Sequence, residues 1–505
     1  MNLTLREKVS QFFLPAAFIH DSEENYQALE DLIRKENIGG LTFFHSRHSA
    51  AANFEKRAEA LTYSGTLEKM IGLINRYQQV AKTPLLISID AEYGLAMRIE
   101  NTPQYPFAIS LGALQTDAIT KVEEVGFRMG KDLKSAGIHL NFAPCADVNT
   151  NPDNPVIGYR SFGDKVEKVA DLALANYQGM KRAGIGACLK HFPGHGDTAV
   201  DSHLGLPVLQ KSRAELDAEE LAPFKKGIAN GVEMIMVGHL AVPALTNGKD
   251  IPASISSEII TDLLKKEMGF TGLVVSDALN MKAVANLFPT PGELELKAFE
   301  AGNDLLCFSD HVEDGIEKIA SSVDPKKIEQ VFEKVMELKK RLGVLDFEVL
   351  DVPEFDWKSH SAFQSHLASD YVKVIQGDLN TFQLNSLAKI KKLAHRTFFG
   401  KSPSLFSELL NKHFNQKLEE NSIEDSEMVL ISAFIPSHKP LNIFGMKDAI
   451  LEEIKKIAKS KPTILVHFGN PLALRHFGEL KDFHTVICAY QGFEETQREV
   501  AKLFS

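Results

Sequence analysis

Short apolar runs alternate with longer amphipathic stretches from about residue 39 to residue 342. The runs read GGLTFF, PLLISID, GIHLNFAPCADV, IGACLKHF, VEMIMVGH, TGLVVSDAL and NDLLCFS. Between most of them lie stretches with helical periodicity, among them residues 116–136, 165–183, 214–230 and 257–268. Strand–helix alternation of this length is typical of a (β/α)8 barrel. The sequence therefore predicts an α/β protein with an N-terminal TIM-type barrel.

A second, shorter alternating region follows. Residues 324–342 read as an amphipathic helix that closes the barrel, and the acidic, proline-containing stretch after it reads as a linker. We expect a catalytic barrel domain over residues 1–345, a linker over 346–365 and a smaller doubly wound α/β sandwich domain over 366–505. We expect this last domain to be incomplete and to act as a scaffold.

Composition and charge exclude several classes of partner. The 505 residues include 56 basic and 67 acidic side chains, and the net charge of -11 argues against nucleic acid and anionic membranes. No apolar run is long enough for a spanning helix. The N-terminus lacks the layout of a secretion signal, and four scattered cysteines read as buried thiols. These features predict a cytoplasmic protein, and they leave its oligomeric state open.

Five of the apolar runs end in ionisable residues, namely Asp90, Asp147, Lys190 with His191, His239 and Asp277. Each alone could be a helix cap or an ordinary polar loop residue. All five together are not expected by chance. Because a barrel gathers the carboxyl ends of its strands on one face, we expect these side chains to share one pocket.

The run ending at Lys190 continues into the loop KHFPGHGDTAVDSH, which ends in Asp201 and His203. Residues two apart in an extended loop face the same way, so this carboxylate can accept a hydrogen bond from one imidazole nitrogen. The other nitrogen is then available for proton transfer. The same pattern also occurs in ordinary surface loops, and its weight comes from the loop around it.

Asp277 and three other polar residues suggest sugar chemistry. A carboxylate at the end of a buried strand suits nucleophilic attack or charge stabilisation, although Asp277 could equally cap a helix over 278–285. Asp90, Arg160 and Lys190 are of the type that holds sugar hydroxyls through directional hydrogen bonds. A glycosidase needs an acid for the leaving oxygen and a carboxylate for the oxocarbenium-like centre. His203 with Asp201 could be the acid, and Asp277 the carboxylate.

The loop KHFPGHGDTAVDSH resembles the signature of the β-N-acetylglucosaminidases of glycoside hydrolase family 3. DAEYGLAMR (90–98), NFAPCADVNTNPDNPVIGYRSFG (141–163) and VVSDALNM (274–281) are similar to further segments of that family, in the same order. Tyr93 departs from the family pattern, which commonly has glycine there, so the resemblance does not define the rim of the pocket.

The resemblance implies a retaining exo-β-N-acetylglucosaminidase of the β-N-acetylhexosaminidase class. Asp277 would form a covalent glycosyl-enzyme intermediate, and His203 paired with Asp201 would be the acid/base. The residues that would bind the terminal sugar are Asp90, Arg160, Lys190 and His191. The resemblance also implies no metal, no organic cofactor and a saccharide partner, either a peptidoglycan fragment or a chitooligosaccharide.

Other readings of the same residues stay open. A glycoside phosphorylase could use the same scaffold, because a histidine acid/base does not repel phosphate. Specificity could be of the β-glucosidase type, or the protein could bind saccharides without turnover. A more distant alternative is a metal-dependent hydrolase whose ligands would be drawn from His191, His195, His203, Asp197 and Asp201.

Overall fold

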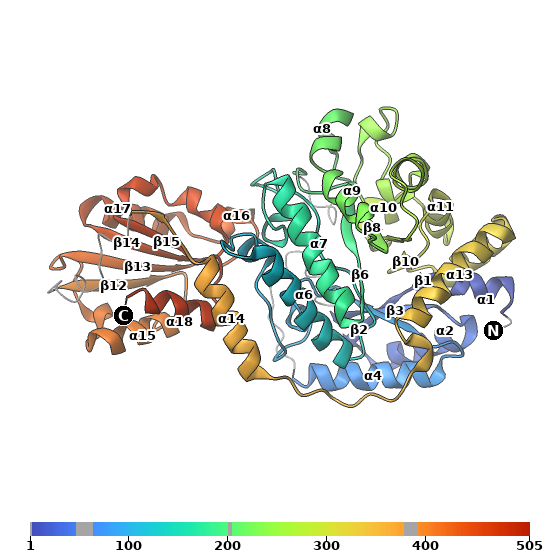
Figure 1. Ribbon diagram of the computed structural model, residues 1–505, viewed down its shortest axis with the longest axis horizontal. Helices are drawn as coiled ribbons and strands as arrows, with labels where there is room; N and C mark the ends of the chain where they lie inside the picture. Colours follow the sequence, from blue (N-terminus) through green and yellow to red (C-terminus); the bar gives the residue numbers. More distant parts are fainter. Residues whose placement is uncertain (1–2, 47–63, 200–204, 378–391, 505) are drawn as a thin grey trace. The chain divides into compact units, whose positions relative to one another are not determined.

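The computed structural model describes residues 3–46, 64–199, 205–377 and 392–504 (Figure 1). Its contacts divide the chain into two compact units. The first contains Met1–Tyr105, Ile119–Asn151 and Asp164–Phe355, and the second contains Pro106–Ala118, Pro152–Gly163 and Asp356–Ser505. Neither unit is one continuous stretch of chain. The expected bounds of the domains, at residues 345 and 366, stay a prediction.

Parallel strands form the interior of the first unit. They are β1 (Phe13–Leu14), β2 (Ala16–His20), β3 (Gly40–Ser46), β4 (Leu86–Ile89), β5 (Leu140–Asn141), β6 (Gly186–Ala187), β7 (Leu189–Phe192), β8 (Met234–Val237), β9 (Leu273–Ser276) and β10 (Leu306–Cys307). Strands β2 to β6 pair in chain order, as do β7 to β9, and β10 pairs with β1. Isolated bridges join Cys145 to Lys190 and Val275 to Leu305. This order is consistent with the expected barrel, whose closure stays a prediction.

Helices follow most of these strands. They are α1 (Leu5–Ser10), α2 (Glu23–Glu36), α4 (Thr66–Val80), α6 (Ala118–Ser135), α7 (Val166–Ala183), α8 (Arg213–Ala218), α9 (Ala222–Ala229), the π-helix η5 (Glu258–Glu267), α10 (Lys282–Ala285), α11 (Glu293–Ala301), α12 (Val312–Ser322) and α13 (Pro325–Arg341). The stretch expected as one helix over 214–230 is divided into α8 and α9. Pro223 explains the division, because proline suits the first turn of a helix and interrupts a helix interior.

Helix α13 carries a lysine into the interior of the first unit. Lys339 is fully buried, and its Nζ donates to Gln11 Oε1 at 2.6 Å and to the carbonyl oxygen of Pro84 at 2.9 Å. Burial lowers the pKa of Lys339 to about 7, because the ammonium is disfavoured away from water.

The second unit contains a five-stranded sheet in the order β11 (Lys373–Gln376), β15 (Thr485–Cys488), β14 (Thr463–Phe468), β13 (Met428–Phe434) and β12 (Leu393–Phe398). Only β11 runs antiparallel to its neighbour. The helices of this unit are α5 (Ala108–Leu111), α14 (Trp357–Tyr371), α15 (Leu405–Phe414), α16 (Leu441–Phe444), α17 (Asp448–Ser460) and α18 (Glu494–Lys502).

Two apolar clusters lie against this sheet. Leu451 and Ile454 of α17 belong to one cluster. Phe406 of α15 and Val500 of α18 belong to the other. Successive residues of a strand point to opposite faces, and alternate residues of β13 enter different clusters, so helices cover both faces. The expected α/β class with a doubly wound second sheet is therefore confirmed.

Two segments from earlier in the chain, residues 106–118 and 152–163, also belong to the second unit. Gln491 Oε1 accepts from Ser110 Oγ at 2.9 Å and from the Phe107 backbone at 3.2 Å. The Asp370 carboxylate accepts from the backbone of Gln115 at 3.2 Å. Helix α14 begins at Trp357, inside the stretch expected as a linker. The sequence pattern did not indicate these attachments.

Two further expectations can be compared with the structure. All four cysteines are buried free thiols, as predicted. Within the described parts of the chain, no helix has the length and apolar character needed to span a membrane.

Candidate active site

A buried ammonium connects the ends of β4 and β7. Lys190 Nζ lies 2.6 Å from Asp90 Oδ1 and 2.8 Å from Glu92 Oε1, and only 2% of Lys190 is exposed. Arg98 Nε donates to the Asp90 carbonyl oxygen at 3.1 Å, and its guanidinium lies 3.9 Å from the centre of the Phe44 ring. The structure thus brings the predicted residues Asp90 and Lys190 into contact and adds Glu92 beside them.

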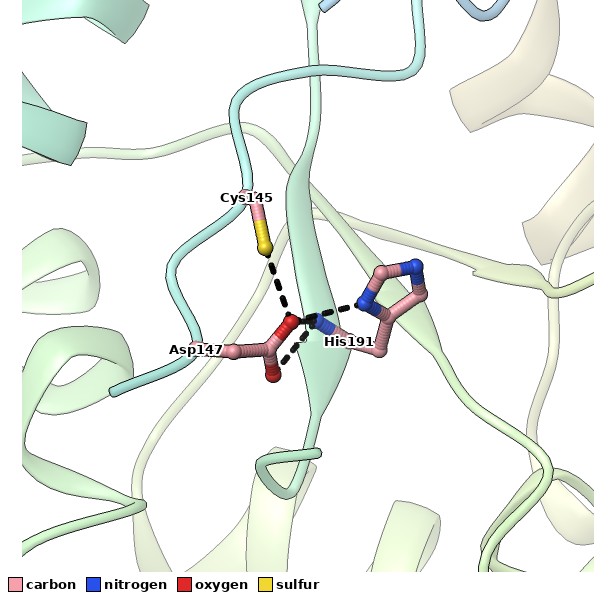
Figure 2. A group of neighbouring side chains, drawn as sticks. All are labelled: Cys145, Asp147 and His191. Carbon is pink, nitrogen blue, oxygen red and sulfur yellow. Dashed lines mark hydrogen bonds and ion pairs between the residues drawn. The ribbon is translucent and has the colours of Figure 1, made fainter. Parts of the chain in front are cut away.

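Asp147, at the end of the next apolar run, holds the start of the KHFPGHGD loop. Its Oδ2 lies 2.7 Å from His191 Nδ1 (Figure 2). Its Oδ1 accepts from the His195 backbone at 2.7 Å. The Cys145 thiol donates to the same carboxylate at 2.9 Å. All four residues are buried. His191 is therefore oriented by a carboxylate from the segment that follows β5.

The contacts among Cys145, Asp147 and His191 bear on the metal alternative. Their sulfur, oxygen and nitrogen donors lie within 4.8 Å of one another, and they are the one such group found among the described residues. The same atoms already hydrogen-bond to each other in Figure 2. Asp197, another ligand of that alternative, lies 3.3 Å from Lys211. The group of Cys145, Asp147 and His191 shares only His191 with the ligand set expected for a metal-dependent hydrolase.

Asp277 lies at the end of β9 and is half-buried. Its Oδ1 accepts from the Ala278 backbone at 2.8 Å. Burial would raise its pKa, but the imidazoles of His239 and His191, that backbone N–H and the Lys190 ammonium outweigh burial and bring the pKa to about 2. Asp277 is therefore an ionised carboxylate at neutral pH, as a nucleophile requires.

His239, at the end of β8, supports the backbone next to Asp277. Its Nε2 lies 2.8 Å from the carbonyl oxygen of Ala278, and its Nδ1 lies 2.7 Å from Ser254 Oγ. Because a carbonyl oxygen only accepts, Nε2 carries a hydrogen. The ring is fully buried, and it holds Ala278 in place in addition to lowering the pKa of Asp277.

Three predicted site residues remain, namely Arg160, Asp201 and His203. Arg160 ends the short helix η2 (Gly158–Arg160) in the second unit, and its Nη1 donates to the Val156 carbonyl oxygen at 3.2 Å. Its position relative to Asp90 and Lys190 stays a prediction. Asp201 and His203 lie outside the described residues, so their predicted pairing is untested.

Glu92 and Cys145 were missed by sequence reasoning. Glu92 is two residues from Asp90, and Cys145 is two residues from Asp147. Side chains two apart in extended backbone face the same side, which is a signal for Cys145 beside Asp147. Glu92 lies in a turn, so that alternation does not account for it.

Comparisons with known proteins show what the chain is similar to. The model of the glycosyl hydrolase family 3 N terminal domain matches residues 4–342. Beta-hexosaminidase A of Pseudoalteromonas piscicida is 37% identical over 292 residues, which cover 55% of this chain and 46% of that protein. The beta-hexosaminidase of Xylella fastidiosa (strain M23) is 32% identical over 297 residues, covering 57% of this chain and 82% of that protein. The alignment thus spans less than half of the Pseudoalteromonas protein.

A solved structure extends the similarity to the whole chain. It is that of a glycoside hydrolase family 3 beta-N-acetylglucosaminidase from Paenibacillus sp. str. FPU-7, with 25% sequence identity and a TM-score of 0.76. The similarity covers 100% of this chain and 97% of that one. The resemblance inferred from the four sequence segments is therefore confirmed.

Proposed function

Because this chain belongs to glycosyl hydrolase family 3, we propose that it is a retaining exo-β-N-acetylglucosaminidase that removes terminal β-linked N-acetylglucosamine. The observation that carries the proposal is the ionised state of Asp277. His239, His191 and Lys190 bring the pKa of this carboxylate down to about 2. An ionised carboxylate beside groups that suit sugar hydroxyls is what a double displacement at an anomeric carbon needs. The names of the beta-hexosaminidase relatives support the choice of sugar.

In the proposed mechanism, an Asp277 oxygen attacks the anomeric carbon and forms a glycosyl ester. The bond from that carbon to the leaving oxygen breaks, and His203, oriented by Asp201, protonates the departing oxygen. His203 then removes a proton from water, which attacks the anomeric carbon and releases Asp277. Two displacements at one carbon give net retention.

The terminal sugar is proposed to be held by Asp90, Arg160, Lys190 and His191. Lys190 is fixed between two carboxylates, so the position of its ammonium is set before a sugar arrives. We also propose that the substrates are peptidoglycan fragments or chitooligosaccharides, and that the protein acts in the cytoplasm.

The first experiment compares wild type with Asp277→Ala on an aryl β-N-acetylglucosaminide. We expect the variant to lose turnover by orders of magnitude, because no other group is proposed to form the ester. Mass spectrometry of slowly turned-over substrate should find the sugar on the peptide containing Asp277. Turnover near the wild-type rate in this variant would reject the assignment.

The second experiment tests His203 through the leaving group. His203→Ala should impair substrates with poor leaving groups far more than activated aryl glycosides, which need little protonation. Equal losses on both substrates would mean that His203 is not the acid.

The third experiment identifies the products from a panel of aryl glycosides in phosphate and in a neutral buffer. Release of free N-acetylglucosamine in both buffers is the expected result. Formation of a sugar 1-phosphate in the phosphate sample would mean that the reaction is phosphorolysis and not the proposed hydrolysis. Preferred release of glucose would replace the proposed specificity with that of a β-glucosidase.

A further inference from the structure

Asp147 collects hydrogen-bond donors from β7, from the loop that follows β7 and from the nearby Cys145. Its carboxylate accepts from the His191 backbone at 3.2 Å and the His195 backbone at 2.7 Å, and its Oδ2 lies 2.7 Å from His191 Nδ1. The Cys145 thiol adds a contact at 2.9 Å (Figure 2). Only 1% of Asp147 is exposed, and a buried carboxylate is costly unless it is satisfied in this way.

These contacts determine which nitrogen of His191 carries a hydrogen. Burial would raise the pKa of Asp147, but the charges and hydrogen bonds of His191, with His195 and the Cys145 thiol, outweigh burial and lower it. An ionised carboxylate only accepts, so the hydrogen between the two side chains belongs to His191 Nδ1. When the imidazole is neutral, its lone pair is then on Nε2.

Asp147 also anchors the backbone of the loop that continues in sequence to Asp201 and His203. Its bond to the His195 backbone lies next to Gly196, where a Cβ would come within 1.8 Å of the Val148 carbonyl oxygen. The Thr198 hydroxyl lies 2.6 Å from His195 Nδ1 and 3.0 Å from its carbonyl oxygen. The start of the loop is therefore packed against the segment that carries Asp147.

We propose that Asp147 is a positioning residue for the sugar site: it sets the tautomer and orientation of His191 and fixes the start of the catalytic loop. The inference rests on the proposed function, because His191 is taken to hold the terminal sugar. Asp147 itself acts through His191 and the His195 backbone.

The test replaces Asp147 with asparagine, which keeps the shape and loses the charge. The amide N–H of Asn would face His191 Nδ1, so the ring hydrogen should move to Nε2. We expect kcat/KM on the aryl β-N-acetylglucosaminide to fall about 10²-fold, the cost of misplacing a group by about 1 Å. The tautomer is read from histidine ¹⁵N chemical shifts, and the His191 signal is assigned by its loss in His191→Gln.

Asp132→Asn is the matched control. Asp132 is also a carboxylate of the first unit and accepts from Tyr105 Oη at 2.6 Å, and among the described residues it has no hydrogen bond to a proposed site residue. We expect this variant to keep the wild-type kcat/KM and the wild-type His191 signal. A loss equal to that of Asp147→Asn would assign the effect to general damage and overturn the inference.

Two results decide the inference even if Asp147→Asn does not fold. Wild-type His191 protonated at Nδ1 supports it, and wild-type His191 with a bare Nδ1 overturns it. If wild type releases no N-acetylglucosamine, the proposed function fails, while the tautomer measurement still tests the role of Asp147. A folded Asp147→Asn protein with unchanged kcat/KM and tautomer would also overturn the inference.

Discussion

Replacing Lys190 with methionine should strongly destabilise the first unit. Methionine keeps much of the length of the side chain and removes the charge that lies 2.6 Å from Asp90 and 2.8 Å from Glu92. Removing one partner of a buried ion pair costs about 3–5 kcal/mol, because the other charge is left without compensation. Two carboxylates are left here, so we expect the free energy of unfolding at pH 7 to fall by about 5 kcal/mol.

A second variant tests whether uncompensated charge is the cause. Glu92 is the more buried of the two carboxylates, with 8% of its side chain exposed against 25% for Asp90. Adding Glu92→Gln to Lys190→Met should restore about 2 kcal/mol, within the range of coupling between contacting residues.

The measurement is urea denaturation followed by circular dichroism. The control is Lys225→Met, whose ammonium lies 2.7 Å from Asp217 in a pair with 43% and 34% of the side chains exposed. Exposed pairs of this kind contribute less than about 1 kcal/mol. Equal losses in Lys190→Met and Lys225→Met would refute the argument from burial, and so would no recovery in the double variant.

Three further predictions test the loop, a buried amine and the metal alternative. Gly196→Ala should displace the loop and so lower kcat/KM at least about 10²-fold. Gly205→Ala is the control, because a Cβ there meets nothing within 4 Å, and it should leave kcat/KM unchanged. Equal kcat/KM values in the two variants would contradict the prediction. Lys339 has a pKa of about 7 when folded and 10.5 otherwise, so the unfolded state binds more protons between these values and the free energy of unfolding should rise with pH there. Lys339→Met should show a smaller rise in urea denaturation between pH 7 and 9, and an unchanged slope would count against the shift. Turnover should survive a strong chelator; a loss restored by added zinc would favour the metal-dependent alternative.

Much of the site could be predicted from how the strands end. Asp90 and Lys190, 100 residues apart, are in contact, and so are Asp147 and His191, 44 residues apart. Parallel strands place their carboxyl ends at one edge, so a pattern of apolar runs with ionisable ends carries three-dimensional information. The roles assigned to these side chains still depend on the experiments above.

Other features have no such local signal. β1 and β2 lie in FFLPAAFIH, which reads only as an apolar patch because Pro15 interrupts it. The attachment of residues 106–118 and 152–163 to the second unit depends on partners such as Gln491, more than 300 residues away. Side-chain contacts over that distance leave no periodicity in either segment.

The way the chain passes between its units limits how the protein can be shortened. A fragment ending at residue 345 would keep residues 106–118 and 152–163 but lose Asp370 and Gln491, which accept hydrogen bonds from the first of these segments. It would also lose His438, whose ring centre lies 5.1 Å from that of Tyr159, the neighbour of Arg160. Such a fragment would contain the whole region matched by the family model. Arg160, which is expected to bind the sugar, would nevertheless lie in a segment that has lost its packing partners.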